Sequence, residues 1–140
     1  MKVKEMEKEL GLFIKENDNF LLLTHEKPDG DAIGSICGLF TLLRDNGKKT
    51  DAFLPEQPPA RYCQFMPEGV MIGGSPKLEK YSWILCLDTS VPDRIGLGKD
   101  DKEKALSFHI ANIDHHPDNK LFGKINFVVP DSAATSEIVF

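Results

Sequence analysis

NFLLLTHEKPDGDAIGSICGLFTLLRDNG, residues 19–47, is the stretch of sequence that decides the fold. It opens with a continuous apolar run over residues 19–25, which is typical of a strand covered on both faces of its sheet. From residue 31 to residue 46 the apolar positions follow helical spacing, and Asn46 followed by Gly47 is a helix stop. The stretch therefore predicts a strand, a loop and a helix in succession.

The same kind of apolar run recurs along the chain. Residues 83–87, 108–113 and 125–129 have the pattern of buried strands, and residues 49–54 have a weaker one. Strands that alternate with helical patterns form crossover units. We therefore predict an α/β fold, with a mostly parallel, doubly wound sheet and helices on both faces.

Helical patterns also lie at the two ends of the chain. Apolar residues at three- and four-residue spacings among charges predict an amphipathic surface helix over residues 2–16. A short helix over residues 61–65 is expected inside the proline-punctuated stretch 55–67. Residues 130–132 resemble a helix cap, and about one turn of that helix follows before Phe140, whereas helices average about three turns.

Composition excludes several classes of protein. At 140 residues, 41% hydrophobic and 28% charged, the chain has the make-up of one soluble domain. A net charge of −5 without a basic run argues against duplex DNA as a partner. Its apolar runs are well below the roughly 18 residues of a membrane span, and no signal-peptide core is present, so we expect a cytoplasmic protein. The scattered Cys37 and Cys86 are expected to be small buried hydrophobes in a reducing compartment.

Acidic and imidazole side chains follow three of the predicted strands. Because ligands of parallel sheets bind beyond the carboxyl ends of the strands, these side chains are expected to share one edge of the sheet. They are His25, Asp29 and Asp31 in THEKPDGD, Asp88 in CLDTS, and Asp114, His115 and His116 in NIDHH.

Each motif taken alone also has a structural interpretation. PDGD is a good turn, in which Asp31 could cap the following helix. Asp88 could cap the turn over residues 89–92, and an isolated DHH is most often a polar loop. Together, however, so many carboxylates at one edge would repel one another, a cost that divalent cations remove.

Asp and His without Cys form a ligand set suited to Mn²⁺ or Mg²⁺, with Zn²⁺ or Co²⁺ as substitutes. We predict manganese. Gly30 lets Asp29 and Asp31 diverge toward neighbouring ions, and Asp88 can bridge them. Two ions about 3.5–4 Å apart activate water and support an in-line phosphoryl displacement. The chemistry predicted from the residues is therefore hydrolysis.

At these residues the chain resembles the DHH phosphoesterase family. The resemblance lies in HxxxDxD (His25, Asp29, Asp31), the strand-end Asp88 and the tripeptide Asp114-His115-His116, which occur in this order. THEKPDGDAIGS and SAATSEIVF are most similar to the branch that contains oligoribonucleases (nanoRNases) and 3′-phosphoadenosine-5′-phosphate phosphatases.

The resemblance implies a manganese-dependent hydrolase that acts on short single-stranded RNA or small nucleotides. It also implies that His25, Asp29 and Asp88 hold one ion, while Asp31, Asp88 and His115 hold the other. In the same picture His116 contacts the scissile phosphate and assists the leaving group, and Asp114 orients its neighbours. We leave open whether Arg94 meets the substrate or braces its loop, and whether the chain forms a homodimer.

The sequence also departs from the family pattern. Family members usually carry a further acidic ligand downstream, and a second, smaller domain with a glycine-rich basic patch. Residues 1–140 contain neither feature, and Asp131 lies too early to be nominated as the further ligand. We therefore expect residues 1–140 to be a DHH domain from the amino-terminal part of a longer enzyme.

Other classes of enzyme and binding protein have motifs that can be compared with this sequence. In haloacid-dehalogenase-like phosphatases DxD follows a strand directly, whereas residues 26–28 intervene here before Asp29. A metallo-β-lactamase-like site would need HxH before the Asp-His pair, and a dinucleotide fold would need GxGxxG. An inorganic pyrophosphatase with the same metal set remains an alternative, as does a catalytically incompetent metal- or nucleotide-binding module.

Overall fold

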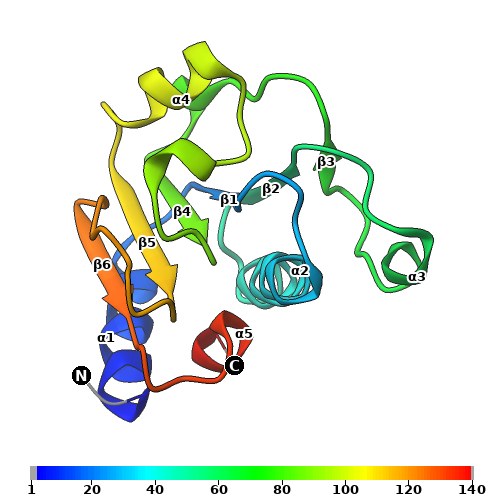
Figure 1. The fold of residues 1–140 in the computed structure, drawn as a ribbon. Helices are drawn as coiled ribbons and strands as arrows, with labels where there is room; N and C mark the ends of the chain where they lie inside the picture. Colours follow the sequence, from blue (N-terminus) through cyan, green and yellow to red (C-terminus); the bar gives the residue numbers. More distant parts are fainter. Residues whose placement is uncertain (1–2, 140) are drawn as a thin grey trace.

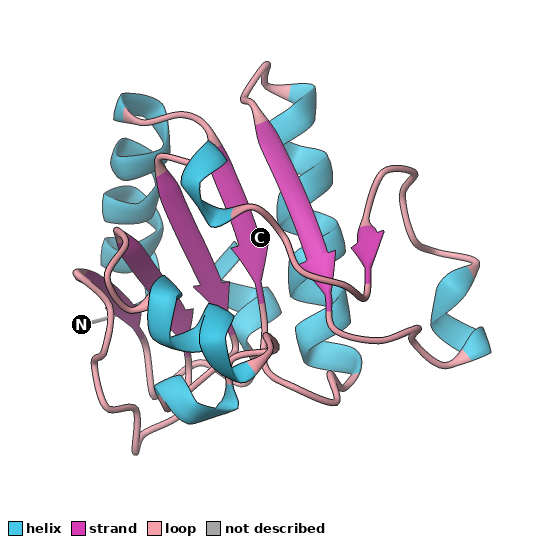
Figure 2. Cartoon of the chain, turned by 90° about the horizontal axis from the view of Figure 1, so that it is seen from above, coloured by secondary structure: helices cyan, strands magenta, loops and turns pink. Residues whose placement is uncertain are grey.

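Six parallel strands form one sheet in the order β3-β2-β1-β4-β5-β6 (Figure 1). The structure is a computed structural model, and it describes residues 3–139. Figure 2 shows that the strands all point in the same direction. The strands are β1 (Phe20–Leu23), β2 (Thr50–Leu54), β3 (Met71–Ile72), β4 (Trp83–Leu87), β5 (Ile110–Asp114) and β6 (Ile125–Val128).

Helices cover both faces of this sheet, so the predicted α/β architecture is confirmed. The helices are α1 (Val3–Glu16), α2 (Gly30–Asp45), α3 (Ala60–Cys63), α4 (Lys99–Ala105) and α5 (Thr135–Val139), with 3₁₀ turns η1 (Leu78–Lys80) and η2 (Pro92–Arg94). One core lies between the sheet and α1, α2 and α5, while the other lies under α4 and the 3₁₀ turns.

Strand β1 shows why its sequence is apolar at every position. Phe20 and Leu22 point into the core beneath α1 and α2, and Leu21 and Leu23 point into the core on the opposite face. All four side chains are buried. Because successive side chains of a strand alternate between faces, a strand covered on both sides needs apolar residues throughout.

Several predicted boundaries shift in the structure. The strand predicted over residues 108–113 is β5, which ends at Asp114 itself, and the short helix begins at Ala60. The predicted cap at residues 130–132 is wrong, since the last helix begins at Thr135. The predicted first residue of the first helix, Lys2, and the chain end, Phe140, lie outside the described residues.

The elements that were not predicted are short or lack apolar periodicity. Strand β3 has two residues, and α4 buries only Ala105. Cys86 is buried as expected, and this burial raises the pKa of its thiol to about 12, whereas Cys37 is only partly buried. Among residues 3–139, we find no helix with the length and apolar character required to cross a membrane.

The order of the strands creates a crevice between β1 and β4. From β1 the chain moves through β2 to β3 on one side, and from β4 it moves through β5 to β6 on the other. The segments that leave β1 and β4 therefore diverge, although the strands themselves are paired. Such a reversal of strand order is where open α/β sheets bind ligands.

Candidate metal centre

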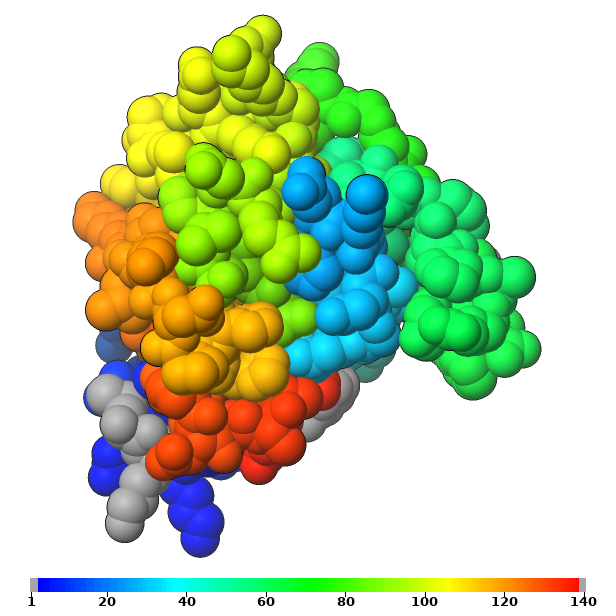
Figure 3. Space-filling model, in the orientation of Figure 1, coloured from blue at the N-terminus to red at the C-terminus, as the bar shows by residue number. Residues whose placement is uncertain are grey.

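Three loops meet at this crevice. They follow β1, β4 and β5, and in Figure 3 their surfaces, blue, green and orange, adjoin on the face at the carboxyl ends of the strands. The structure brings together all seven side chains singled out from the sequence: His25, Asp29, Asp31, Asp88, Asp114, His115 and His116.

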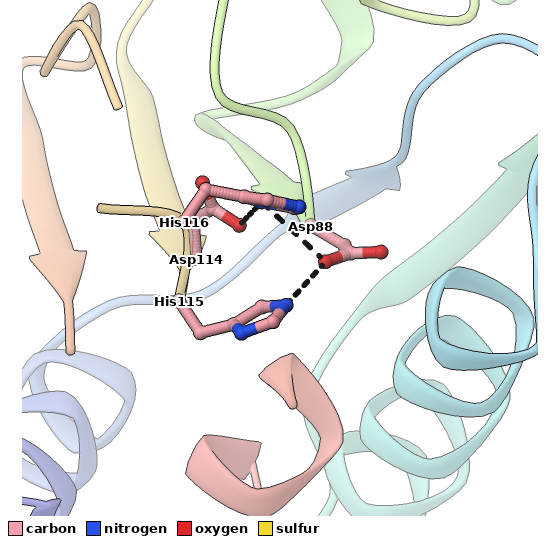
Figure 4. A group of neighbouring side chains, drawn as sticks. All are labelled: Asp88, Asp114, His115 and His116. Carbon is pink, nitrogen blue, oxygen red and sulfur yellow. Dashed lines mark hydrogen bonds and ion pairs between the residues drawn. The ribbon is translucent and has the colours of Figure 1, made fainter. Parts of the chain in front are cut away.

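Asp88 lies at the centre of the cluster and is 3% exposed. Its Oδ2 is 3.6 Å from His25 Nε2, and its Oδ1 is 3.6 Å from His115 Nε2. Figure 4 shows the rings of His115 and His116 converging on this carboxylate. Oδ2 of Asp88 therefore faces His25, whereas Oδ1 faces His115 and, at a longer distance, His116.

The backbone of Asp88 takes an unusual conformation, with φ of 56°. Only a few per cent of non-glycine residues adopt a positive φ, and Asp and Asn are enriched among them. The conformation falls directly after β4, at the carboxyl end of the strand. Strained backbone of this kind often marks a functional site.

On one side of Asp88 lie His25 and Asp29, with His25 Nε2 3.8 Å from Asp29 Oδ1. His25 Nδ1 lies 2.7 Å from the carbonyl oxygen of Glu26, which can only accept a hydrogen bond. Nδ1 therefore carries the proton, and the Nε2 lone pair faces the two carboxylates. The Asp88 carboxylate beside the ring, aided by the Glu26 carbonyl, outweighs burial and raises the pKa of His25, because both favour a second proton on the imidazole.

On the other side lie Asp31 and His115, with Asp31 Oδ2 3.5 Å from His115 Nε2. His115 Nδ1 lies 3.3 Å from the Ser132 carbonyl oxygen, so its Nε2 lone pair also faces the carboxylates. Asp31 accepts hydrogen bonds from the backbone amides of Thr135 and Ser136, each at 3.0 Å. Burial alone would raise the pKa of Asp31, but these amides outweigh it and hold the pKa low.

His116 has a different partner. Its Nδ1 is 2.6 Å from Oδ1 of Asp114, which is completely buried, and 3.9 Å from Asp88 Oδ1. Burial by itself would lower the pKa of His116, but the hydrogen bond with Asp114 outweighs this effect and raises the pKa. Since Asp114 holds Nδ1, Nε2 is the ring atom free to exchange a proton.

The electrostatics of the cluster fit bound cations. Burial raises the pKa of Asp88, even though the neighbouring His25 ring acts in the opposite direction, and the nearby charges of Asp31 and Asp29 raise it further. A cation would remove this penalty. The oxygen and imidazole donors suit manganese or magnesium.

The donors form two overlapping groups. His25, Asp29 and Asp88 make one, and Asp88, Asp114, His115 and His116 make the other. Within each group the ligand atoms lie within 4.8 Å of one another, and Asp88 belongs to both. The residues present therefore fit a pair of ions that share Asp88 as a ligand.

Arg94 lines a pocket of about 70 Å³ beside the cluster. His25, Asp29, Asp88, Thr89, Ser90 and His116 line the rest of it. The backbone oxygen of Arg94 also accepts a hydrogen bond from the Glu26 amide at 2.8 Å. Its backbone thus braces the loop after β1, while its exposed side chain borders the pocket.

Thr135 is a site residue that sequence reasoning missed. Its hydroxyl donates a 2.9 Å hydrogen bond to Asp88 Oδ1, and its side chain is buried. Thr135 reaches the site because α5 packs against α2. This contact joins Asp31 and Thr135, which are 104 positions apart in the chain. The motif SAATS carries no separate signal for such a contact.

Asp29, and not Asp31, caps helix α2. Its Oδ1 accepts a 3.0 Å hydrogen bond from the Ala32 amide, so the interpretation of Asp31 as the cap is wrong. Asp31 lies inside the first turn of α2, and its carboxylate accepts hydrogen bonds from backbone amides of α5 instead. Asp29 thus has a structural role in addition to its place in the cluster.

The two roles of Asp29 can be separated by substitution. Serine caps a helix about as well as aspartate, so Asp29→Ser should leave the stability of the metal-free protein within about 0.5 kcal/mol of wild type. Asp29→Ala should cost about 1 kcal/mol. Both variants lose the carboxylate and should bind Mn²⁺ about 10-fold or more weakly. Urea unfolding and calorimetric Mn²⁺ titration measure the two effects, and unchanged affinity in Asp29→Ser would leave the cap as the only role.

The chain is similar to known proteins in sequence. Residues 19–140 match the family described as "DHH family, N-terminal domain". The chain is 36% identical over 119 residues to the bifunctional oligoribonuclease and PAP phosphatase NrnA of Thermus thermophilus, with 84% of the chain covered. It is 29% identical over 136 residues to the protein of the same name from Bacillus subtilis, with 96% of the chain covered.

These matches involve only part of each relative. The aligned region amounts to 34% of the Thermus protein and 41% of the Bacillus protein. Among solved structures, an exopolyphosphatase-related protein from Bacteroides fragilis superposes with a TM-score of 0.81 at 24% identity, over 98% of this chain and 42% of that one. This last match supports the fold.

Proposed function

Because the chain belongs to the DHH family, we propose that it is the metal-binding part of a two-metal phosphoesterase. Its substrates are short oligoribonucleotides, including the linear products of cyclic dinucleotides, or nucleoside 3′,5′-bisphosphates, and its products are mononucleotides. The observation that carries the proposal is the placement of Asp88, whose two oxygens each lie 3.6 Å from a different imidazole. The activities named for the Thermus and Bacillus relatives support the choice of substrate.

The proposed ligands divide around Asp88. His25, Asp29 and Asp88 hold one Mn²⁺, and Asp31, Asp88 and His115 hold the other, with Mg²⁺ or Co²⁺ as possible substitutes. The hydrogen bonds from the Nδ1 atoms of His25 and His115 to backbone carbonyls leave both Nε2 lone pairs free for this purpose. Bound ions would polarise the phosphoryl group and neutralise its charge.

The remaining side chains bind the substrate and move protons. In the doubly protonated form of His116, which its raised pKa favours, Nε2 gives its proton to the leaving oxygen, while the Nδ1 proton stays hydrogen-bonded to Asp114. Arg94 borders the same pocket as His116 and attracts the anionic substrate, which the net charge of −5 would otherwise repel. A substrate of one or two nucleotides needs no long basic groove.

A side-by-side rate comparison tests the proposal. The chain, and any longer form that its gene encodes, is assayed with Mn²⁺ on a ribodinucleotide, on 3′-phosphoadenosine 5′-phosphate and on pyrophosphate. We expect hydrolysis of at least one nucleotide substrate to exceed that of pyrophosphate, to stop with a chelator and to return with Mn²⁺. Pyrophosphate as the best substrate would replace the proposal with a pyrophosphatase, and bound ions without turnover of any substrate would indicate a binding module.

A further inference from the structure

A buried polar network lies beneath His116, and Asp114 is the only one of its members that the proposed mechanism uses. Its members are Asn112 on β5, Asn119 in the loop before β6, and Asp114. Asn112 and Asp114 have no exposed surface. Buried amides are costly unless each polar atom is paired, so the orientation of this network is constrained.

The orientation of each amide follows from its partners. Asn112 Nδ2 lies 3.1 Å from the Cys86 carbonyl oxygen and 3.0 Å from that of Thr89, and both carbonyls only accept. Asn112 therefore presents its Oδ1 to Asn119, at 2.8 Å from Asn119 Nδ2. The Leu121 amide donates to Asn119 Oδ1 at 2.6 Å, which independently requires that Nδ2 face Asn112.

Asn119 Nδ2 also lies 2.8 Å from Asp114 Oδ2. The two short contacts use both of its protons, one on Asn112 and one on Asp114, whereas the Thr89 carbonyl oxygen lies farther away, at 3.3 Å. Asp114 consequently has Oδ2 held by Asn119 and Oδ1 held by His116 Nδ1. A buried carboxylate with both oxygens engaged cannot turn toward the ions, although it lies close to the other donors.

We propose that Asn119 is a positioning residue, which fixes the Asp114 carboxylate and through it holds the His116 ring with Nδ1 on Asp114 and Nε2 free. The structural part of this inference stands without the proposed function, while its catalytic consequence rests on that function. Without the amide, Asp114 can rotate away from His116, and either ring nitrogen can then carry the proton. A carboxylate partner that fixes tautomer and ring orientation commonly contributes about 10- to 100-fold.

The competing interpretation is that Asn119 only shapes its loop. Its Oδ1 closes a turn onto the Leu121 amide, which serine can imitate more weakly with its hydroxyl. The loop has other anchors, because the Lys120 amide donates to the Ser90 carbonyl at 2.9 Å and Asn126 Nδ2 donates to the Gly123 carbonyl at 2.9 Å. Asn126 thus braces the same loop but has no hydrogen bond with Asp114 among the described residues.

The experiment compares Asn119→Ser and Asn119→Ala with the matched control Asn126→Ala. The ¹⁵N resonances of the His116 ring are recorded in the metal-free protein, where paramagnetic Mn²⁺ does not broaden them. We expect wild type and Asn126→Ala to show Nδ1 protonated, and Asn119→Ser to show a mixture of tautomers. If Asn119→Ala does not fold, Asn119→Ser still tests the positioning role, because the serine hydroxyl can accept the hydrogen bond from the Leu121 amide.

In the Mn²⁺-loaded protein, Asn119→Ser should lower kcat by about 10- to 100-fold with little change in KM or in bound metal. An unchanged tautomer in both Asn119 variants would overturn the inference. A shifted tautomer with unchanged kcat would overturn its catalytic part. If the wild-type protein hydrolyses none of the substrates, the proposed function fails, yet the ring resonances still decide the positioning role.

Discussion

Replacing Asp88 with asparagine should lower the hydrolytic rate by about 10³-fold or more while the protein stays folded. Each oxygen of Asp88 faces a different imidazole at 3.6 Å, so the carboxylate is shared by both proposed ion positions. An amide has one oxygen, and its other end is a donor that repels a cation. The variant should therefore bind fewer than two Mn²⁺ ions per chain.

Asparagine is the substitution that isolates this effect. Asp88 has a φ of 56°, a conformation that asparagine tolerates and that most other side chains strain. The amide oxygen can still accept the hydrogen bond that the Thr135 hydroxyl donates at 2.9 Å. Because burial and the neighbouring carboxylates raise the pKa of Asp88, its neutralisation should not destabilise the metal-free protein.

Three measurements check the prediction. They are kcat/KM, the metal content after gel filtration, and the rise in melting temperature on adding Mn²⁺, which reports binding to the native state. The control is Asp93→Asn, an exposed aspartate in the 3₁₀ turn η2, which should match wild type in all three. An Asp88→Asn variant that keeps a tenth of the wild-type rate would contradict the bridging role.

The sequence predicted the part of the site that depends on the ends of strands. Buried parallel strands are recognisable as apolar runs, and residues at their carboxyl ends must share one edge of the sheet. His25 and Asp88 could therefore be placed together before their distance was known. The order of the strands, which puts β1 beside β4, turned that shared edge into a crevice.

Other contacts could not be predicted because they depend on packing between distant segments. The hydrogen bonds from Thr135 to Asp88 and from the amide of Thr135 to Asp31 require α5 to lie against the start of α2. The role of Asn119 depends on which way two buried amides point. Neither feature has a periodic or local sequence signal. The cap at Asp29 was missed because either aspartate of PDGD could have been the N-cap of α2.

Replacing His116 with glutamine should lower kcat by about 10²- to 10⁴-fold on a nucleotide substrate while both ions stay bound. Glutamine retains a polar side chain but cannot carry and release a proton at neutral pH. In the structure Nδ1 of His116 is held by Asp114 at 2.6 Å, so the ring is oriented by a residue that we do not assign to either ion. His116→Gln should therefore keep both ions, whereas Asp88→Asn should bind fewer than two per chain.

The leaving group provides the sharper test of His116. An oxygen that leaves as a ribose alkoxide needs a proton, whereas p-nitrophenolate leaves without one. We therefore expect the kcat deficit of His116→Gln to shrink to less than about tenfold on a p-nitrophenyl nucleotide ester. The exposed His109, which contacts the ring of Trp83, supplies the control, since His109→Gln should match wild type on both substrates. An equal deficit on both substrates would assign His116 to substrate binding, and loss of an ion would make it a metal ligand.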